Sequence, residues 1–479
     1  MLIYDLEKRE GKPIYEYLYC CIKKDILRGV LKPGEKLPSK RELARDHKIA
    51  LITVENAYAQ LIIEGYVVAK EKSGYFVSAQ ELEDSVLSVR DPQENLPIAD
   101  SGKKEDSAAK KAAGGEIRQR EWLVDFSSSQ LRADAFPFAT WSKLLRRVMD
   151  EREDVFLQKP ESIGVLKLRE NIAMYLKKAK GLDVSADRIL VGPGTEYLHH
   201  VILQLLGRSR IVAVEDPGYK KVGQIYEGNG LKCLHIPVDE YGLMVGRLVG
   251  SNAGLVHISP SHHFPTGCVM PIGRRKKLLE WARSQGAYLV EDDYDSEFRF
   301  DGRPVPTLAS LDDETVIYMN TFTKTLAPSI RMAYMVLPEK LKDLYDKKLS
   351  YYSGSVSSFE QYTLAAFIGE GYYERHINRM RNYYRQQRTK ILTTLQESSL
   401  AERVSVEEHA AGLHFILKVT GIRDDAKWLK KLEAKRIRLN PVSAYCYGTQ
   451  EKYRHQFVIY YSDLDLDNLK EAFEIMAKN

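Results

Sequence analysis

Residues 320–338 read NTFTKTLAPSIRMAYMVLP. They follow Val316–Met319, a β-rich run that predicts a strand, and they contain Lys324 and, seven residues later, Arg331. In open α/β sheets, ligands bind beyond the carboxyl ends of the parallel strands. Lys324 therefore lies where a binding site is expected, although most lysines at such an edge are only solvated. The residues at neighbouring strand ends decide between these two interpretations.

Two more predicted strands end in groups that bind ligands. One is followed by Glu291-Asp292-Asp293-Tyr294-Asp295 and the other by Gly192-Pro193-Gly194-Thr195-Glu196. An EF-hand calcium loop is excluded, because its sixth position, counted from Asp293, requires glycine and Phe298 stands there. Backbone N–H groups at a helix start, as expected after Gly194, bind phosphate well. A pyridoxal phosphate site needs a lysine for a Schiff base, an acid against the pyridinium nitrogen and phosphate donors, and these three strand ends supply all of them.

The chain around these motifs reads as an α/β domain. From residue 122 onward, β-rich runs alternate with helical patterns, which predicts a mostly parallel sheet with helices on both faces. The runs are Ile189–Val191, Ile211–Val214, Leu255–Ile258, Ala287–Val290 and Val316–Met319. Beyond about residue 370, a long helix (Tyr373–Gln396), a strand (Gly412–Val419) and a terminal helix (Leu466–Ala477) predict a smaller α+β subdomain. We expect residues 122–479 to form one domain, with residues 370–479 as its small part.

Residues 1–78 have a different pattern. Ile14, Leu18, Ile22 and Ile26 recur at intervals of four and predict an amphipathic helix. Ser39-Lys40-Arg41-Glu42 has the form of a capping box and predicts a short second helix to about His47. A third helix should bury Val54, Ala57, Tyr58, Leu61 and Ile62, and the runs Tyr66–Ala69 and Tyr75–Val77 predict a hairpin. Three helices followed by a hairpin indicate a winged helix-turn-helix.

Between the two domains, residues 79–121 contain almost no aromatic residues and many Ser, Ala, Gly and charged ones. Such a segment buries too little apolar area to offset its ordering entropy, so we expect a flexible linker. Residues 1–78 hold 14 Lys and Arg against 11 Asp and Glu, a net charge of +3. That small excess is compatible with nucleic-acid binding but does not establish it.

Composition excludes several classes. The 479 residues contain no stretch near 18 consecutive apolar residues, so no membrane span is expected. The first residues lack the apolar core of a secretory signal, and the five cysteines lack zinc-ligand spacing. We expect a cytoplasmic protein with no metal site.

Four stretches carry a family resemblance: EDPGY (215–219), SPSHHFPTG (259–267), EDDYDSEFRF (291–300) and NTFTKTLAPSIRMAYMVLP (320–338). With them, the body resembles a fold-type-I aminotransferase. The whole chain, apart from the linker, resembles the MocR/GabR-type regulators of the GntR family, which join a winged helix to such a domain. The resemblance implies a transcription regulator that binds pyridoxal 5'-phosphate and double-stranded DNA with repeated half-sites. It also implies a homodimer.

The resemblance assigns roles at the cofactor site. Lys324 would be the catalytic lysine and carry the internal aldimine, and Asp292 would face the pyridine nitrogen. Tyr294 would bind the ring hydroxyl and Tyr219 would stack on the ring. The expected phosphate ligands are Gly194, Thr195, Thr321 and Arg331, and Thr323 is also expected to bind the cofactor.

Three departures from the aminotransferase pattern affect the expected activity. Phe264 replaces the asparagine that binds the ring hydroxyl in many aminotransferases, and His262 is a candidate substitute. Asp463 stands where an arginine usually clamps the substrate α-carboxylate. Lys221 falls where the GABA-sensing relative has a second effector-binding arginine. A simple α-amino acid held by the usual arginine is therefore not expected, and neither is productive transamination.

In the head, the family's Leu-Pro-Ser-x-Arg-Glu-Leu-Ala is intact as residues 37–44, which implies DNA contact by Arg41. Relatives often begin the recognition helix with Ser-Arg, but Ala50-Leu51 stands here. The other expected DNA contacts are Ser39, Lys40, Thr53, Lys72, Ser73 and Gly74. A winged helix that binds a protein is the structural alternative.

Three functions are consistent with these residues. The first is a regulator in which an amine or amino-acid effector exchanges onto the aldimine at Lys324. The second is a working aminotransferase with an accessory DNA-binding head. In the third, pyridoxal phosphate is itself the signal, as in regulators of vitamin B6 synthesis.

Overall fold

The computed structural model describes residues 4, 13–27, 29–63, 66–70, 73–77, 122–128, 135–151, 153–300, 305–407, 411–448, 451–464 and 466–479. The expected linker, residues 79–121, and Lys72 of the expected wing lie outside these residues. The chain divides into two compact units, Met1–Gly115 and Glu116–Asn479. Each unit is described separately.

The first unit is a winged helix-turn-helix, as the sequence predicts. It consists of α1 (Ile14–Leu27), α2 (Lys40–Asp46), α3 (Leu51–Ile63) and the antiparallel hairpin of β1 (Val67–Lys70) and β2 (Gly74–Val77). The capping box is present, because the Glu42 N–H donates to Ser39 Oγ at 3.2 Å and the Ser39 N–H donates to Glu42 Oε2 at 3.3 Å. The apolar faces of the three helices form one buried cluster.

The second unit is built on an eight-stranded sheet in the order β4-β11-β10-β9-β8-β5-β6-β7. Only β11 and β7 run against the others, so the sheet is mixed but mostly parallel. The strands are β4 (Ile189–Gly192), β5 (Ile211–Asp216), β6 (Lys232–Asp239), β7 (Gly242–Leu243), β8 (Ala253–Ile258), β9 (Tyr288–Asp292), β10 (Val316–Thr321) and β11 (Ala333–Val336).

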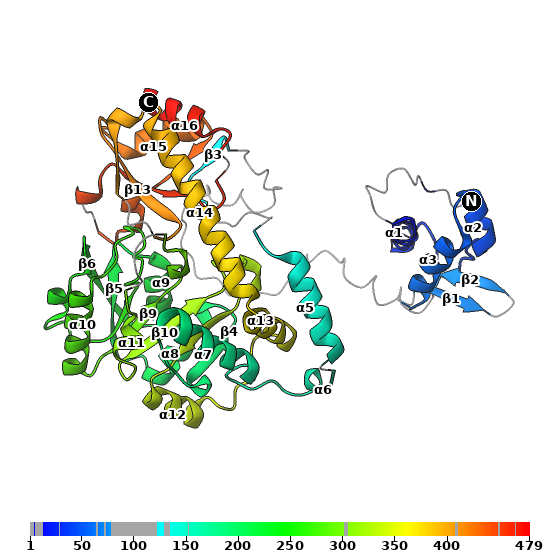
Figure 1. Ribbon diagram of the computed structural model, residues 1–479, viewed down its shortest axis with the longest axis horizontal. Coiled ribbons are helices and arrows are strands. Elements are labelled where there is room, and N and C mark those ends of the chain that lie inside the picture. Colours follow the sequence, from blue (N-terminus) through cyan, green and yellow to red (C-terminus); the bar gives the residue numbers. More distant parts are fainter. Residues whose placement is uncertain are drawn as a thin grey trace, which may run out of the picture. The chain divides into compact units, whose positions relative to one another are not determined.

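Alternate residues of the strands explain why helices cover both faces of this sheet. On β10, Val316 and Tyr318 belong to one buried cluster, whereas Ile317 and Met319 belong to a second. Figure 1 shows the sheet packed among helices in the green part of the chain. These helices are α7 (Leu166–Lys180), α8 (Thr195–Leu206), α9 (Lys220–Gly228), α10 (Ile272–Gln285), α11 (Leu308–Leu311), α12 (Glu339–Lys348) and α13 (Ser358–Gly369), preceded in the chain by α5 (Phe138–Glu151) and α6 (Glu153–Phe156).

The small α+β part is also present. Its four-stranded sheet contains β12 (Val404–Glu407), β13 (His414–Val419), β16 (Gln456–Tyr460) and β15 (Asn440–Pro441), in that order. The helices are α14 (Tyr372–Gln396), α15 (Asp425–Ala434) and α16 (Leu469–Lys478). The long helix α14 contacts both α13 and α16, so it joins the two parts (Figure 1). An element that the sequence did not predict is β3 (Val124–Asp125), which pairs in parallel with β14 (Ile437–Arg438). Among the described residues, no helix has the length and hydropathy needed to cross a membrane.

Candidate functional site

The carboxyl ends of five parallel strands, β4, β5, β8, β9 and β10, meet at one edge of the large sheet. A cavity of about 240 Å³ lies there. Nine of the residues predicted for the cofactor or effector line it: Thr195, Tyr219, Lys221, Asp292, Tyr294, Thr321, Thr323, Lys324 and Arg331. Two of the predicted residues, Gly194 and His262, are not among its lining residues.

Lys324 lies in the turn that follows β10, and its neighbour Thr325 anchors that turn to α14. Tyr373 donates a hydrogen bond to Thr325 Oγ1 at 3.1 Å, and His376 Nε2 lies 2.7 Å from the Thr325 carbonyl oxygen. Burial lowers the pKa of Lys324, and the charge of Asp295 opposes this effect only in part. A lowered pKa favours the neutral amine, which is the nucleophilic form of lysine.

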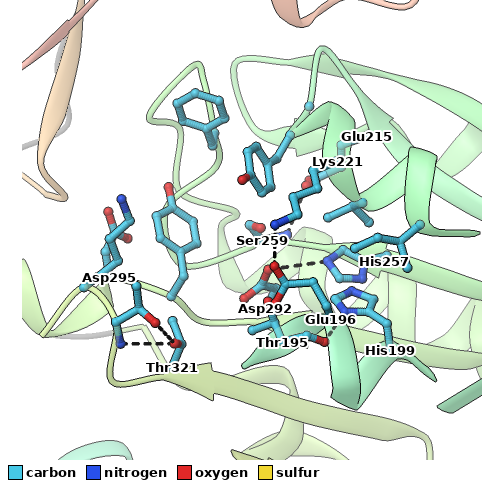
Figure 2. Close-up of a pocket in the computed structure, with 18 of the residues that line it drawn as sticks. Thr195, Glu196, His199, Glu215, Lys221, His257, Ser259, Asp292, Asp295 and Thr321 are labelled. Atoms are coloured by element: carbon cyan, nitrogen blue, oxygen red, sulfur yellow. Dashed lines mark hydrogen bonds and ion pairs between the residues drawn. The ribbon is translucent and has the colours of Figure 1, made fainter. Parts of the chain in front are cut away.

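Asp292, the last residue of β9, faces a group of histidines that the sequence did not single out. His257 Nε2 lies 3.5 Å from Asp292 Oδ2, and the His257 ring is stacked on that of His199 with centroids 5.1 Å apart (Figure 2). Burial, and next the neighbouring His257, lower the pKa of His199 to about 4, so this ring is neutral near pH 7. The other carboxylate oxygen, Asp292 Oδ1, is buried and has no hydrogen-bond partner within the described part of the chain.

Cationic and hydroxyl groups also line the cavity, and several of them lie around the start of α8. Thr321 Oγ1 accepts from the Thr323 N–H at 3.1 Å, which fixes the turn between β10 and Lys324. Gly194 precedes α8 with a φ of +103°, and a Cβ there would lie 2.6 Å from Arg331 Nη2. Glycine therefore allows the Arg331 guanidinium to approach the helix start.

Glu196, on the first turn of α8, bridges two cations at this place. Its Oε2 accepts from Arg331 Nη2 at 2.9 Å, and its Oε1 pairs with Lys221 (Figure 2). Partial burial raises the pKa of the Glu196 carboxyl, but the Lys221 hydrogen bond and the charges of Arg331 and Lys221 outweigh burial and lower it to about 2. Lys221, the predicted effector ligand, is thus held by an acid that the sequence did not single out.

Tyr294 reaches the cavity, whereas His262 lies behind it. The Tyr294 hydroxyl is 3.3 Å from His262 Nδ1, and the same nitrogen is 2.9 Å from Asp295 Oδ2. His262 is 3% exposed and packs against Gly412, where a Cβ would lie 1.8 Å from the His262 ring. His262 is a candidate from the sequence for binding the ring hydroxyl, and the structure places its ring against Tyr294 and Asp295.

The remaining walls include groups from the small part of the unit. Phe264 packs edge-on against Tyr219, with ring centroids 6.1 Å apart, and both line the cavity together with His414 and Tyr460. Asp463, which stands at the position of the usual arginine, is exposed and does not line the cavity. Glu215 is buried at the end of β5, and burial raises its pKa to about 8.

In the first unit, the predicted DNA contacts lie on α2, α3 and the hairpin. Arg41 and Ser73 are exposed, Ser39 is exposed as the cap of α2, and Thr53 and Gly74 are partly exposed. Lys40 lies 3.6 Å from Glu55 and 5.4 Å from the centre of the Tyr75 ring. Lys72 lies outside the described residues.

Known proteins match both units. Residues 123–472 match the family described as aminotransferase class I and II, and residues 14–77 match the gntR family of bacterial regulatory proteins. The fold resembles a kynurenine aminotransferase from Pyrococcus horikoshii, with a TM-score of 0.66 and 25% identity over 75% of this chain and 91% of that one. The second unit therefore has the fold of the aminotransferase class I and II proteins, a family that depends on pyridoxal phosphate.

Full-length relatives combine both units. The uncharacterized HTH-type transcriptional regulator YdeL of Bacillus subtilis is 34% identical over 90% of this chain and 89% of its own. The probable rhizopine catabolism regulatory protein MocR of Rhizobium meliloti is 30% identical over 91% of this chain and 88% of its own. The chain belongs to the MocR/GabR-type transcription regulators, in which a GntR-family winged helix is joined to an aminotransferase-like domain.

Proposed function

We propose that this regulator binds pyridoxal 5'-phosphate at Lys324 and responds to an amine-bearing effector that enters the same cavity. When bound, the cofactor supplies an aldehyde that reacts with amines and a pyridine ring that withdraws electrons. The observation that carries the proposal is a buried oxygen of Asp292 that has no hydrogen-bond partner among the described residues, on a cavity that Lys324 also lines. A buried carboxylate oxygen without a partner is costly, and a protonated pyridine nitrogen would satisfy it.

The other groups of the cavity fit the same cofactor. Burial lowers the pKa of Lys324, which favours the neutral amine that bonds to an aldehyde carbon. Arg331 offers a guanidinium fork for the phosphate, and Thr321 and Thr323 offer hydroxyls that line the same cavity. Tyr294 would hold the ring hydroxyl, and Tyr219, which is 56% exposed, would cover the ring face.

The absorption spectrum of the purified protein tests the cofactor and the lysine together. A visible band should appear in the wild type after addition of pyridoxal phosphate, and Lys324→Ala should lack it. Lys220→Ala is the matched control, because Lys220 is near the cavity but does not line it. A wild type that stays colourless with excess cofactor, or a Lys324→Ala protein that keeps the band, would refute the assignment.

We further propose a cytoplasmic homodimer whose two winged helices bind repeated half-sites on double-stranded DNA. Phosphate contacts make such binding steeply salt-dependent, and removal of the exposed Arg41 side chain should weaken it for all sequences. The measurement is a titration of labelled duplex at several salt concentrations with the wild type and Arg41→Ala. Equal affinities of the two proteins would remove Arg41 from the interface.

Three results would distinguish an amine-responsive regulator from the two alternative functions. Band shifts with candidate amines, together with changed DNA affinity, support an amine effector. DNA affinity that changes with pyridoxal phosphate alone would make the cofactor the signal. Sustained turnover of an amino acid and a keto acid, abolished in Lys324→Ala, would establish the aminotransferase alternative.

A further inference from the structure

Exposed aliphatic side chains begin the recognition helix of the first unit. Leu51 and Ile52, the first two residues of α3, are 39% and 61% exposed, and Ala50 before them is also exposed. Val54, Ala57, Tyr58 and Leu61 of α3 are fully buried. Leu51 and Ile52 are therefore not needed to hold α3 in place, and exposed aliphatic groups gathered at one place indicate an interaction surface.

Exposed basic side chains lie on the segments that precede this aliphatic patch, which we define as Ala50, Leu51 and Ile52. Arg41 and Arg45 on α2 are exposed, as is Lys48 in the turn between α2 and α3. Such an arrangement matches the anionic backbones on either side of a DNA groove, because Lys and Arg contact phosphates there and fix the register of the protein. The charge pattern thus selects a duplex as the occupant of the patch.

The chemistry of the major groove then restricts which bases the patch accepts. Guanine presents acceptors that Arg or Lys usually read, and the helix sequence LITVENAYAQLII contains neither residue. Thymine alone among the bases presents a methyl group, and aliphatic side chains contact it. One turn beyond Ile52, the exposed Asn56 carries the amide that pairs with adenine N6 and N7.

We propose that the start of α3 reads A·T base pairs through thymine methyl groups, which Leu51 and Ile52 contact, with Asn56 set to read adenine. This inference rests on the proposed DNA binding and adds its sequence class. Arg41, Arg45 and Lys48 supply affinity without sequence preference, whereas the aliphatic patch supplies the preference.

The test begins with selection of bound duplexes from a randomised 30-base-pair pool and continues with removal of single methyl groups. In the selected duplex, each thymine is replaced in turn by deoxyuridine, which deletes only the methyl. Replacement at one or two positions per half-site should weaken binding about fourfold, the value expected for one buried methyl-sized group. The Ile52→Ala protein should bind the thymine and deoxyuridine duplexes almost equally at one of those positions.

Val30→Ala is the matched control, because Val30 is 64% exposed in the same unit but lies outside α2 and α3. It should retain the full thymine preference. The proposed thymine readout would be overturned if the selected half-sites shared no thymine, or if no deoxyuridine replacement changed the affinity of the wild type. In either case DNA binding itself would persist. Absence of any salt-dependent DNA binding would instead refute the proposed function, and this readout with it.

Discussion

Replacement of Asp292 by asparagine should have opposite effects on the stability of the cofactor-free protein and on cofactor affinity. Asp292 Oδ1 is buried without a partner among the described residues, and Oδ2 has only the long 3.5 Å approach to His257. A buried group left unsatisfied costs about 1–3 kcal/mol, and more when it is charged. Asparagine removes the charge but leaves a neutral amide in the same place. We therefore expect the cofactor-free variant to be about 1 kcal/mol more stable than the wild type.

Cofactor affinity should fall in the same variant, because a neutral amide cannot form the charge-assisted hydrogen bond to a protonated pyridine nitrogen. Such bonds contribute about 1.5–3 kcal/mol, so their loss should raise the dissociation constant of the cofactor about tenfold to hundredfold. Urea denaturation of cofactor-free protein measures the first quantity, and titration of pyridoxal phosphate followed by absorbance measures the second. A variant that loses stability without cofactor, or that binds the cofactor as tightly as the wild type, would refute the reasoning.

The adjacent Asp293 provides the matched control. Asp293 Oδ1 also lacks a partner among the described residues, but Oδ2 lies 3.1 Å from Lys180 Nζ and accepts from the Tyr318 hydroxyl at 2.7 Å. Asp293→Asn removes these charge-assisted contacts, although Glu297 remains 3.7 Å from Lys180, so it should cost about 1.5–3 kcal/mol. The two neighbouring aspartates should thus change the free energy of unfolding in opposite directions under identical conditions.

Three other substitutions test separate parts of the site. Glu196→Gln removes the carboxylate that competes for Arg331, so pyridoxal phosphate and inorganic phosphate should each bind about tenfold more tightly in a titration. Gly412→Ala should cost about 2–4 kcal/mol in urea denaturation, because the new Cβ meets His262 and the φ is +74°. Gly421→Ala, with a φ of +77° and a Cβ in ordinary van der Waals contact with the Arg403 side chain, should cost about 1 kcal/mol. Burial raises the folded-state pKa of Glu215 from 4.5 to about 8. The folded protein therefore binds this proton more tightly than the unfolded chain, and the free energy of unfolding falls as the pH rises between these values. Glu215→Gln should therefore gain stability relative to the wild type by up to about 1.4 kcal/mol per pH unit in that range.

Five of the eight strands of the large sheet, and several residues that line the cavity, could be predicted because they depend on local patterns, whereas β6, β7 and β11 were not predicted. Alternating β-rich and helical segments identify the parallel strands, and chain direction alone places their carboxyl ends at one edge. Lys324, Asp292 and Thr195 each lie within five residues of the end of a predicted strand, so their convergence needed no knowledge of long-range packing. The capping box at Ser39 was predictable for the same reason, since both partners lie within four residues.

Contacts made by side chains distant in sequence could not be predicted in this way. His199 projects from α8 and His257 from β8, and nothing in either segment indicates that the two rings stack beside Asp292. The pairing of β3 with β14 joins two-residue segments more than 300 positions apart, which are too short to give a periodic signal. The sequence showed that His262 lies in a loop, but it did not show which way the side chain points. His262 therefore remained a candidate ligand of the ring hydroxyl. The glycine at 412, against which it packs, is the feature that turns it toward Asp295.

Three buried hydrogen-bonding groups at the cavity lack hydrogen-bond partners among the described residues. His199 Nε2, His257 Nε2 and Asp292 Oδ1 are all buried and partnerless in the described structure, and the residues that carry them line one cavity. Stability alone would favour apolar replacements at these positions, because each unsatisfied group lowers the free energy of unfolding. Their presence together is explained if a ligand with a hydrogen-bond donor enters the cavity and completes the network. Binding energy and the stability of the empty protein are then set by the same atoms, which is why the two effects of Asp292→Asn should have opposite signs.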